Sequence, residues 1–390
     1  MNWWDTLLGK NPGRKLDNGV LPECGDGYSA VSGDTQAAIA ELSQVVRSNP
    51  DAVEIYLALG NLYRSHGEIE RAVQIRQSLI VRPGLDKETQ AKAWFELGRD
   101  FKRGGFLDRA MGAFEQARSL SGDRASIVAE LARLTADSGD HERAARYYAK
   151  LGHFVAEAHH MVRIATERFA QGQDAAGFKW LRKALKVHPG ALEAWQELMR
   201  QDLGNKNWLD LGKHLDQALE SVQRDLRFVL MEGLIDAAKT HEYGAHCSLE
   251  TEKPFQYYPQ AELTEAVLPV LERQDSDLLL QYYAAWMVCG TDPIGARRWL
   301  ERTLVLNPSF WPARLELLAL DMADMVNKGG PDDHAMSESF RKQLEFFILR
   351  ARELKRFVCR KCGLKREQIF YVCPRCRSWH SIKYRTTINE

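Results

Sequence analysis

The sequence predicts an all-α solenoid of stacked helical pairs that ends in a small metal-binding ribbon. Two observations predict this fold class. A helix-pair motif returns along residues 34–326 at intervals of about 34 residues, and four of the seven cysteines lie within residues 359–376. Apolar residues make up 45% of the 390 residues, which is enough for a sizeable core. We divide the chain into an N-terminal segment (1–33), helical repeats (34–326), a connecting helix (336–356) and the ribbon (357–390).

The N-terminal segment begins MNWWDTLLGK and continues into a linker with several Gly, Pro and Asn residues. It lacks the pattern of a secretory signal, and the chain has no run of 18 apolar residues. We therefore expect no transmembrane helix and a cytoplasmic location. Four apolar residues can share one face of a short helix and contact a membrane surface, the solenoid or a partner: Trp3, Trp4, Leu7 and Leu8.

The repeats follow the tetratricopeptide pattern, in which W-x2-L-G-x2-Y lies in the first helix and A-x3-F in the second. The clearest copies contain Tyr56, Leu59, Gly60, Tyr63 and Ala72, then Trp94, Leu97, Gly98, Phe101, Ala110, Phe114 and Ala117. Weaker copies carry Leu131, Ala132, Ala144, Ile164, Ala165, Leu181, Ala184, Trp195, Leu198, Ala284, Ala296 and Leu300. Glycines at 67, 105, 139 and 172 are predicted to close the first helix of a pair with left-handed backbone.

A solenoid of this kind holds extended peptides or partner helices and has no chemistry of its own. The sequence contains neither a phosphate-binding loop nor a nucleophile elbow. The H-E-x-x-x-H run at His241–His246 is one residue too long to place both imidazoles on one helical face. We therefore expect a scaffold that binds protein partners and not an enzyme.

The connecting helix leads into four cysteines with the spacing C-x2-C-x10-C-x2-C: Cys359, Cys362, Cys373 and Cys376. Two such turns can direct four thiolates at one metal ion, zinc or iron, in a tetrahedral site. All four positions are then occupied by protein ligands, so the site is structural. A domain of this size needs the metal to fold. We expect a strand over residues 367–372 and docking of the ribbon against residues 337–355.

Basic residues are concentrated at this end, because residues 350–385 contain twelve Lys or Arg and two Glu in a chain of zero net charge. One interpretation is a solvated surface, partly neutralised by the acidic remainder of the chain. Another is a nucleic-acid-binding protein in which the basic ribbon is combined with the aromatic residues Phe370, Tyr371, Trp379 and Tyr384. We rank nucleic acid below protein partners, since charge alone does not identify a partner. The sequence leaves the oligomeric state open.

Three stretches together resemble the lipopolysaccharide assembly protein B family of Gram-negative bacteria: residues 59–72, residues 97–110, and FVCRKCGLKREQIFYVCPRCRSWHSIK at 357–383. The resemblance implies that the four cysteines form a rubredoxin-like metal site. It also implies an adaptor that works with the membrane protease FtsH, promotes degradation of the deacetylase LpxC and so limits lipopolysaccharide synthesis. A general scaffold for other envelope enzymes is the alternative within this class. Members usually begin with a membrane-spanning helix, which we do not expect here, so the location implied is peripheral, on the cytoplasmic face of the inner membrane.

Overall fold

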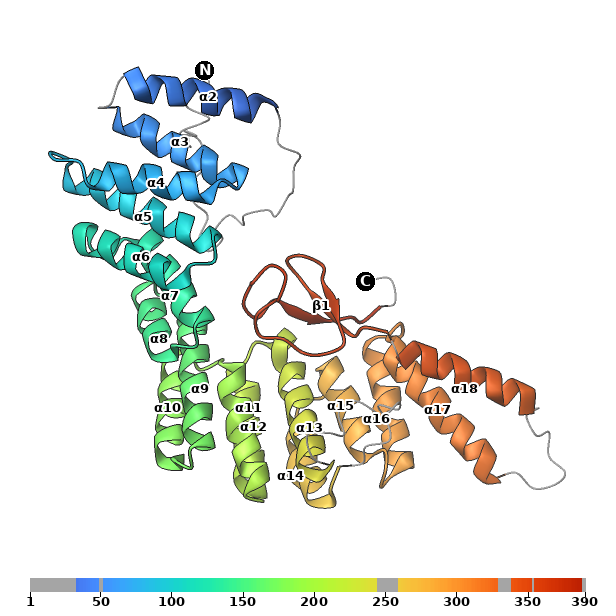
Figure 1. Ribbon diagram of the computed structural model, residues 1–390. Coiled ribbons are helices and arrows are strands. Elements are labelled where there is room, and N and C mark those ends of the chain that lie inside the picture. The colour runs from blue at the N-terminus through green and yellow to red at the C-terminus, as the bar shows by residue number, and fades with distance from the viewer. Residues whose placement is uncertain (1–32, 49–51, 244–258, 329–337, 353, 388–390) are drawn as a thin grey trace. The chain divides into compact units, whose positions relative to one another are not determined.

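The computed structural model describes residues 33–48, 52–243, 259–328, 338–352 and 354–387 (Figure 1). The chain forms two compact units, Met1–His153 and Phe154–Glu390. The helices of the first unit are α2 (Gly33–Ser48), α3 (Val53–His66), α4 (Ile69–Ile80), α5 (Lys87–Arg103), α6 (Leu107–Ser121), α7 (Ala125–Asp137) and α8 (His141–Lys150).

The second unit contains ten further α-helices among its described residues and then the ribbon. These helices are α9 (Phe154–Ala170), α10 (Asp174–Val187), α11 (Leu192–Gly204), α12 (Trp208–Ser221), α13 (Arg227–Tyr243), α14 (Ala261–Glu272), α15 (Leu278–Val288), α16 (Pro293–Leu306), α17 (Trp311–Lys328) and α18 (Glu338–Arg352). A short 3-10 helix, η1 (Arg224–Leu226), precedes α13.

The predicted fold class is confirmed, because consecutive helices pack as pairs and the motif residues form the buried contacts between them. In the clearest copy, Leu97 of α5 is buried, and Ala110, Phe114 and Ala117 of α6 are inaccessible to solvent. The weaker copies behave in the same way, with Leu131 and Ala132 buried in α7. Small residues let the paired helices approach, and large apolar residues fill the space around the contact.

The turns within the pairs repeat one backbone geometry. All four glycines predicted for these turns have positive φ, as in Gly172 with φ 70°. The fifth pair, α11 and α12, has Lys206 at the same place, two residues before the second helix, with φ 55°. Its neighbour Asn207 donates to the Asp202 carbonyl at 2.8 Å, just as Gln173 donates to the Arg168 carbonyl at 2.9 Å. The same turn geometry therefore forms between α11 and α12, although the residue there is lysine and not glycine.

The ribbon is a three-stranded antiparallel sheet of β1 (Phe357–Cys359), β2 (Lys365–Arg366) and β3 (Ile382–Tyr384), in the order β2-β1-β3. Strand β1 pairs Phe357 with Arg366 on one side and with Tyr384 on the other. The strand expected over residues 367–372 does not form, apart from a single bridge between Val372 and Trp379. Side chains of that segment pack on the helices of the unit instead, and Phe370 is buried there.

Further predictions concern the connecting helix, the docking of the ribbon and membrane contact. The predicted connecting helix is present as α18, and the ribbon meets the end of residues 337–355 through Arg385, which donates to the Lys355 carbonyl at 2.7 Å. Other contacts of the ribbon run to α9, α11 and α13, which the sequence did not predict. Within the described ranges, no helix is both long enough and apolar enough to cross a membrane. Trp3, Trp4, Leu7 and Leu8 lie outside the described residues, so their predicted surface contact stays a prediction, as do the predicted domain boundaries.

Candidate metal centre

The four predicted cysteines come together in the ribbon. Their sulfur atoms all lie within 4.8 Å of one another, in the one such metal-compatible group among the described residues. The Sγ atoms of Cys359 and Cys376 are 3.6 Å apart, and so are those of Cys362 and Cys373. All four cysteines are free thiols. Cys359 and Cys373 are buried, whereas Cys362 and Cys376 are half-buried.

Two turns of matching backbone geometry place these thiols. In the first, Gly363 N–H donates to the Cys359 carbonyl at 2.9 Å, and in the second Arg377 N–H donates to the Cys373 carbonyl at 2.8 Å. The N–H groups of Cys359 and Cys373 each donate at 2.9 Å to the carbonyl five residues onward. Gly363 and Arg377 have φ of 70° and 52°. The two Cys-x-x-Cys segments are therefore copies of one turn, although only the first has glycine at its left-handed position.

Serine hydroxyls lie beside the sulfur atoms. The Sγ atom of Cys359 is 3.2 Å from Ser381 Oγ, and that of Cys376 is 2.9 Å from Ser378 Oγ. Burial raises the pKa of Cys359, but hydrogen bonds from Ser381 and from the backbone N–H groups of Cys362 and Lys361 outweigh burial and lower the pKa to about 6. Burial raises the pKa of Cys362 and of Cys373, so Cys359 is the more acidic thiol, and the thiolate is the form that ligates metals.

The donor set fits a metal ion with four thiolate ligands. In a tetrahedron with metal–sulfur bonds of about 2.3 Å, neighbouring sulfur atoms are about 3.8 Å apart. The observed 3.6 Å separations are close to that value, and they are far longer than a disulfide bond of about 2.05 Å. Four sulfur donors leave no open position for water or substrate.

Apolar packing fixes the ribbon on its own unit. Phe357 of β1 stacks on Phe228 of α13 with ring centroids 5.8 Å apart and planes at 16°. Tyr384 of β3 meets the edge of Phe228 at 5.7 Å and packs near Phe310 at 6.0 Å. Phe357, Phe228 and Phe310 are at most 1% exposed. The ribbon and the helices therefore share one hydrophobic core.

Two polar contacts anchor the ribbon to α11 and α13. Arg356 Nη1 lies 2.9 Å from Glu232 Oε1, which also accepts from Tyr283 OH at 2.6 Å. Burial opposes the charge on Arg356, but the Glu232 carboxylate outweighs it and raises the Arg356 pKa. Burial also raises the pKa of Tyr371, whose hydroxyl donates to Gln196 Oε1. Glu232 and Gln196 thus contact side chains in or next to the ribbon that are more than a hundred residues away in sequence.

A third contact joins the ribbon to α9 and α11 through a buried carboxylate. Glu193 Oε2 lies 3.2 Å from His380 Nε2, and Glu193 Oε1 lies 3.1 Å from His159 Nδ1. Burial raises the pKa of Glu193, but these two hydrogen bonds and the histidine charges outweigh it and lower the pKa to about 2. His159 also packs against the Trp379 ring, with centroids 5.0 Å apart.

These contacts involve the aromatic residues for which the sequence suggested stacking on nucleic acid, and three polar residues that sequence reasoning missed. The aromatic residues proposed for stacking on nucleic acid are instead used in packing: Phe370 and Tyr384 are buried, Tyr371 bonds Gln196 and Trp379 packs on His159. Sequence reasoning missed Glu193, Gln196 and Glu232. The available signal was weak, because α11 and α13 contain several other polar residues, such as Glu197 and Asp236.

The chain is similar in sequence to known proteins, both within its helical repeats and over most of its length. A family model described as tetratricopeptide repeat matches residues 30–82. Lipopolysaccharide assembly protein B of Escherichia coli strain K12 is 24% identical over 359 residues, which is 90% of this chain and 86% of that protein. The chain resembles lipopolysaccharide assembly protein B over most of its length. The protein of that name from Haemophilus influenzae is 47% identical over 57 residues, covering 15% of this chain and 14% of its own.

Solved structures give weaker matches. The crystal structure of MamA protein is 25% identical and covers 40% of this chain and 83% of its own, with a TM-score of 0.30. A tetratricopeptide repeat protein from Parabacteroides merdae is 14% identical and covers 80% of this chain and 99% of its own, with a TM-score of 0.31.

Proposed function

We propose that the protein is a non-enzymatic adaptor in lipopolysaccharide assembly that holds protein partners on its helical repeats. The observation that carries this proposal is the similarity to lipopolysaccharide assembly protein B over 90% of the chain. The fold supports it, because stacked helical pairs offer extended surfaces for binding proteins. Among the described residues, the one metal-compatible group is the closed four-cysteine cluster, which leaves no position for a substrate.

The metal has a structural role in this proposal. Cys359, Cys362, Cys373 and Cys376 ligate one ion, zinc or iron, which supplies the folding energy that a ribbon this small cannot obtain from burial alone. The folded ribbon then places Arg356, Tyr371 and His380 against Glu232, Gln196 and Glu193. The ribbon therefore joins helices of the second unit into a single body that partners recognise.

The partners proposed are the membrane protease FtsH and the deacetylase LpxC. The adaptor brings the deacetylase to the protease, and its degradation limits lipopolysaccharide synthesis. This assignment follows from the family resemblance carried by residues 59–72, 97–110 and 357–383. The proposed location is cytoplasmic, at the inner face of the inner membrane, with Trp3, Trp4, Leu7 and Leu8 as the contact.

The test is an affinity pull-down of the tagged full-length chain from mildly solubilised membranes of its own organism, with mass spectrometry of what is retained. Recovery of the protease and the deacetylase, together with accumulation of the deacetylase when the gene is deleted, is the expected result. A Cys373→Ser chain should retain neither partner, and a Cys289→Ser chain should retain both. Unchanged deacetylase levels after deletion would refute the regulatory role, whatever the chain retains.

A further inference from the structure

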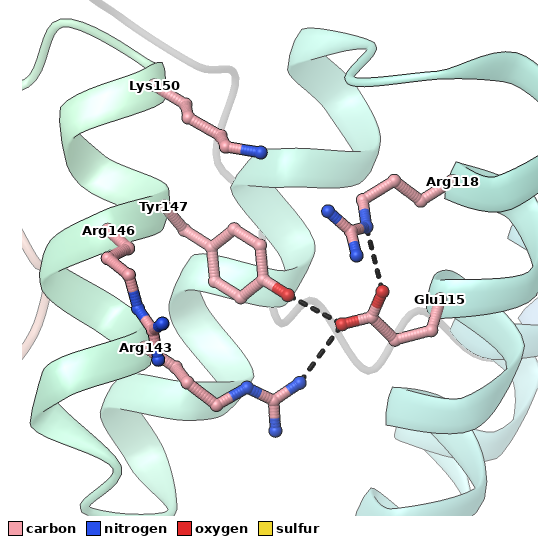
Figure 2. A pocket seen from close by; sticks show the side chains of 6 residues that line it. All are labelled: Glu115, Arg118, Arg143, Arg146, Tyr147 and Lys150. Atoms are coloured by element: carbon pink, nitrogen blue, oxygen red, sulfur yellow. Dashed lines mark hydrogen bonds and ion pairs between the residues drawn. The ribbon is translucent and has the colours of Figure 1, made fainter.

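The first unit contains a basic cavity between the second helices of two neighbouring pairs, α6 and α8. Its volume is about 270 Å³. Glu115 and Arg118 of α6 line it on one side, and Arg143, Arg146, Tyr147 and Lys150 of α8 line it on the other (Figure 2). The four α8 residues recur at helical spacing, so they share one face of that helix. Four cations and one carboxylate therefore surround the space.

The cavity already holds one carboxylate of the chain. Glu115 accepts from Arg118 Nε at 2.8 Å, from Arg143 Nη2 at 3.0 Å and from Tyr147 OH at 2.5 Å. Burial raises the pKa of Glu115, but the hydrogen bonds from Tyr147 and Arg118 outweigh burial and lower its pKa. Charge-assisted bonds of this kind are about twice as strong as neutral ones. The wall of the cavity is thus built to bind a carboxylate.

A second carboxylate, which is not among the lining residues, contacts two of the lining cations. Asp123, in the connection between α6 and α7, lies 2.6 Å from Lys150 Nζ and 3.4 Å from Arg118 Nη1. Its side chain is 46% exposed, and those of Lys150 and Arg118 are 43% and 34% exposed, so water screens this contact and it contributes little to stability. Arg146 is also exposed and donates to the Glu142 backbone carbonyl at 3.3 Å, with no carboxylate partner among the described residues. A carboxylate from outside can therefore replace Asp123 without breaking a buried contact.

We infer that this cavity binds an acidic side chain from an extended segment of a protein partner, which displaces Asp123 from Lys150 and Arg118. A volume of about 270 Å³ is near the lower end of the range of about 300–1,000 Å³ typical of small-molecule pockets, and it is large enough for an acidic side chain. Lys150 and Arg118 already contact the carboxylate of Asp123, so a carboxylate from a partner can make the same contacts. The inference rests on the proposed role as a scaffold for proteins, and it specifies the charge of one partner segment.

The test measures binding of fluorescein-labelled hexaglutamate to the purified full-length chain by fluorescence anisotropy at low salt. Lys150→Gln removes a cation from the cavity and should weaken binding by about threefold. Lys92→Gln, an exposed position on α5, removes the same charge elsewhere in the unit and should change binding by less than about twofold. Equal weakening in both variants would mean that hexaglutamate responds to overall charge, including the basic ribbon, and would overturn the inference.

A variant that should bind hexaglutamate more tightly gives the more specific test. Asp123→Asn removes the competing carboxylate and should tighten binding by about threefold or more. Asp108→Asn, an exposed position on α6, makes the same change of charge outside the cavity and should leave binding nearly unchanged. No tightening in Asp123→Asn, or tighter binding of inorganic phosphate than of hexaglutamate in competition, would contradict a carboxylate site. Such a failure leaves the pull-down result unaffected, so the cavity and the adaptor role are tested separately.

Discussion

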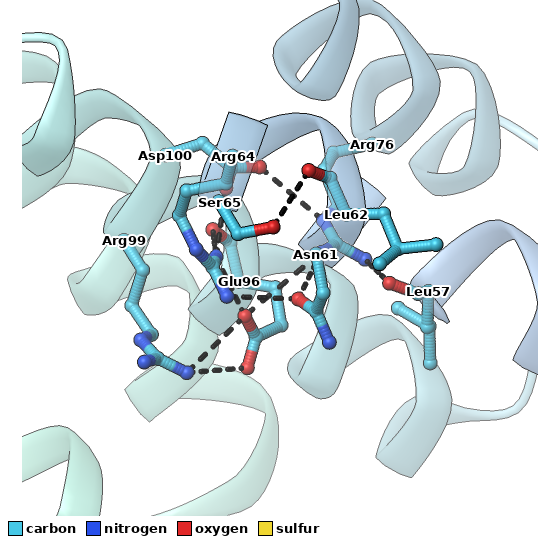
Figure 3. A network of polar contacts seen from close by, with 9 residues as sticks. All are labelled: Leu57, Asn61, Leu62, Arg64, Ser65, Arg76, Glu96, Arg99 and Asp100. Carbon is cyan, nitrogen blue, oxygen red and sulfur yellow. Dashed lines mark hydrogen bonds and ion pairs between the residues drawn. The ribbon is translucent and has the colours of Figure 1, made fainter. Parts of the chain in front are cut away.

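Arg76 of α4 and Asp100 of α5 form a buried ion pair, with Nε and Oδ2 3.3 Å apart and neither side chain exposed (Figure 3). One repeat later, the matching positions are Phe114 and Leu134, which belong to one buried apolar cluster. The guanidinium of Arg76 faces Gly60 just as the Phe114 ring faces Gly98, and a Cβ on either glycine would lie 2.7 Å from it. The same architecture thus accepts a polar pair or an apolar pair.

This pair predicts a stability change that depends on both residues. Burial lowers the pKa of Arg76, so its charge depends on Asp100 and Glu96 nearby. Asp100→Asn leaves the buried guanidinium without its closest carboxylate and should destabilise the protein by about 3 kcal/mol. Arg76→Phe combined with Asp100→Leu copies Phe114 and Leu134 and should recover most of that loss. Urea unfolding measures both variants.

The control for this pair is Glu70→Gln, an exposed change of charge on α4, which should shift the urea midpoint little. If the apolar double variant is less stable than Asp100→Asn alone, the two repeats do not pack equivalently.

The turn between α11 and α12 predicts a stabilising substitution. Lys206 adopts φ 55°, a left-handed conformation that costs a residue with a Cβ about 1 kcal/mol, whereas glycine adopts it freely. Lys206→Gly should therefore raise the free energy of unfolding by about 0.5 kcal/mol, after the greater freedom of glycine in the unfolded chain is subtracted. Lys213→Gly, within α12, should lower it by about 1 kcal/mol. A Lys206→Gly protein less stable than wild type would show that the lysine side chain stabilises the turn.

The Glu193 carboxylate predicts a dependence of stability on pH. Its pKa is lowered from 4.5 to about 2 in the folded chain, so it stabilises the fold fully above pH of about 4.5 and loses this contribution as the pH falls towards 2. Glu193→Gln should cost about 3 kcal/mol at pH 6, and the difference from wild type should shrink on acidification. Unfolding free energies of both proteins at matched pH measure it. Glu220→Gln, on the exposed side of α12, should show no such trend.

The sequence was sufficient for features that repeat or cluster locally. Small and large residues at fixed offsets identified the pairs, and two Cys-x-x-Cys segments identified the ribbon, because each pattern lies within a few tens of residues. The turn at Lys206 was not predicted because lysine is not a typical turn residue, although its position continues the spacing of the turn glycines. The helices that contact the ribbon were not predicted, because Glu193 and His380 are distant in sequence. A single polar residue on an amphipathic helix does not indicate its partner.

Removal of the metal should unfold the ribbon and leave most helices of the second unit folded. Cys373→Ser deletes one buried ligand and should abolish stoichiometric metal binding, since three thiolates and one hydroxyl hold the ion far less well. Far-UV circular dichroism should keep most of its helical signal, because most contacts of the helices are with neighbouring helices and not with the ribbon. Cys289→Ser, outside the cluster, should retain full metal content. Loss of the helical signal in Cys373→Ser alone would show that the repeats depend on the ribbon to fold.

X-ray absorption spectroscopy of the purified full-length chain at its metal edge tests most directly whether four thiolates hold one ion in the ribbon. We expect one ion per chain, zinc or iron, with four sulfur ligands at about 2.3 Å and no nitrogen or oxygen in the first shell. A chain without stoichiometric metal, or an ion with nitrogen or oxygen ligands replacing sulfur, would contradict a structural site made by Cys359, Cys362, Cys373 and Cys376.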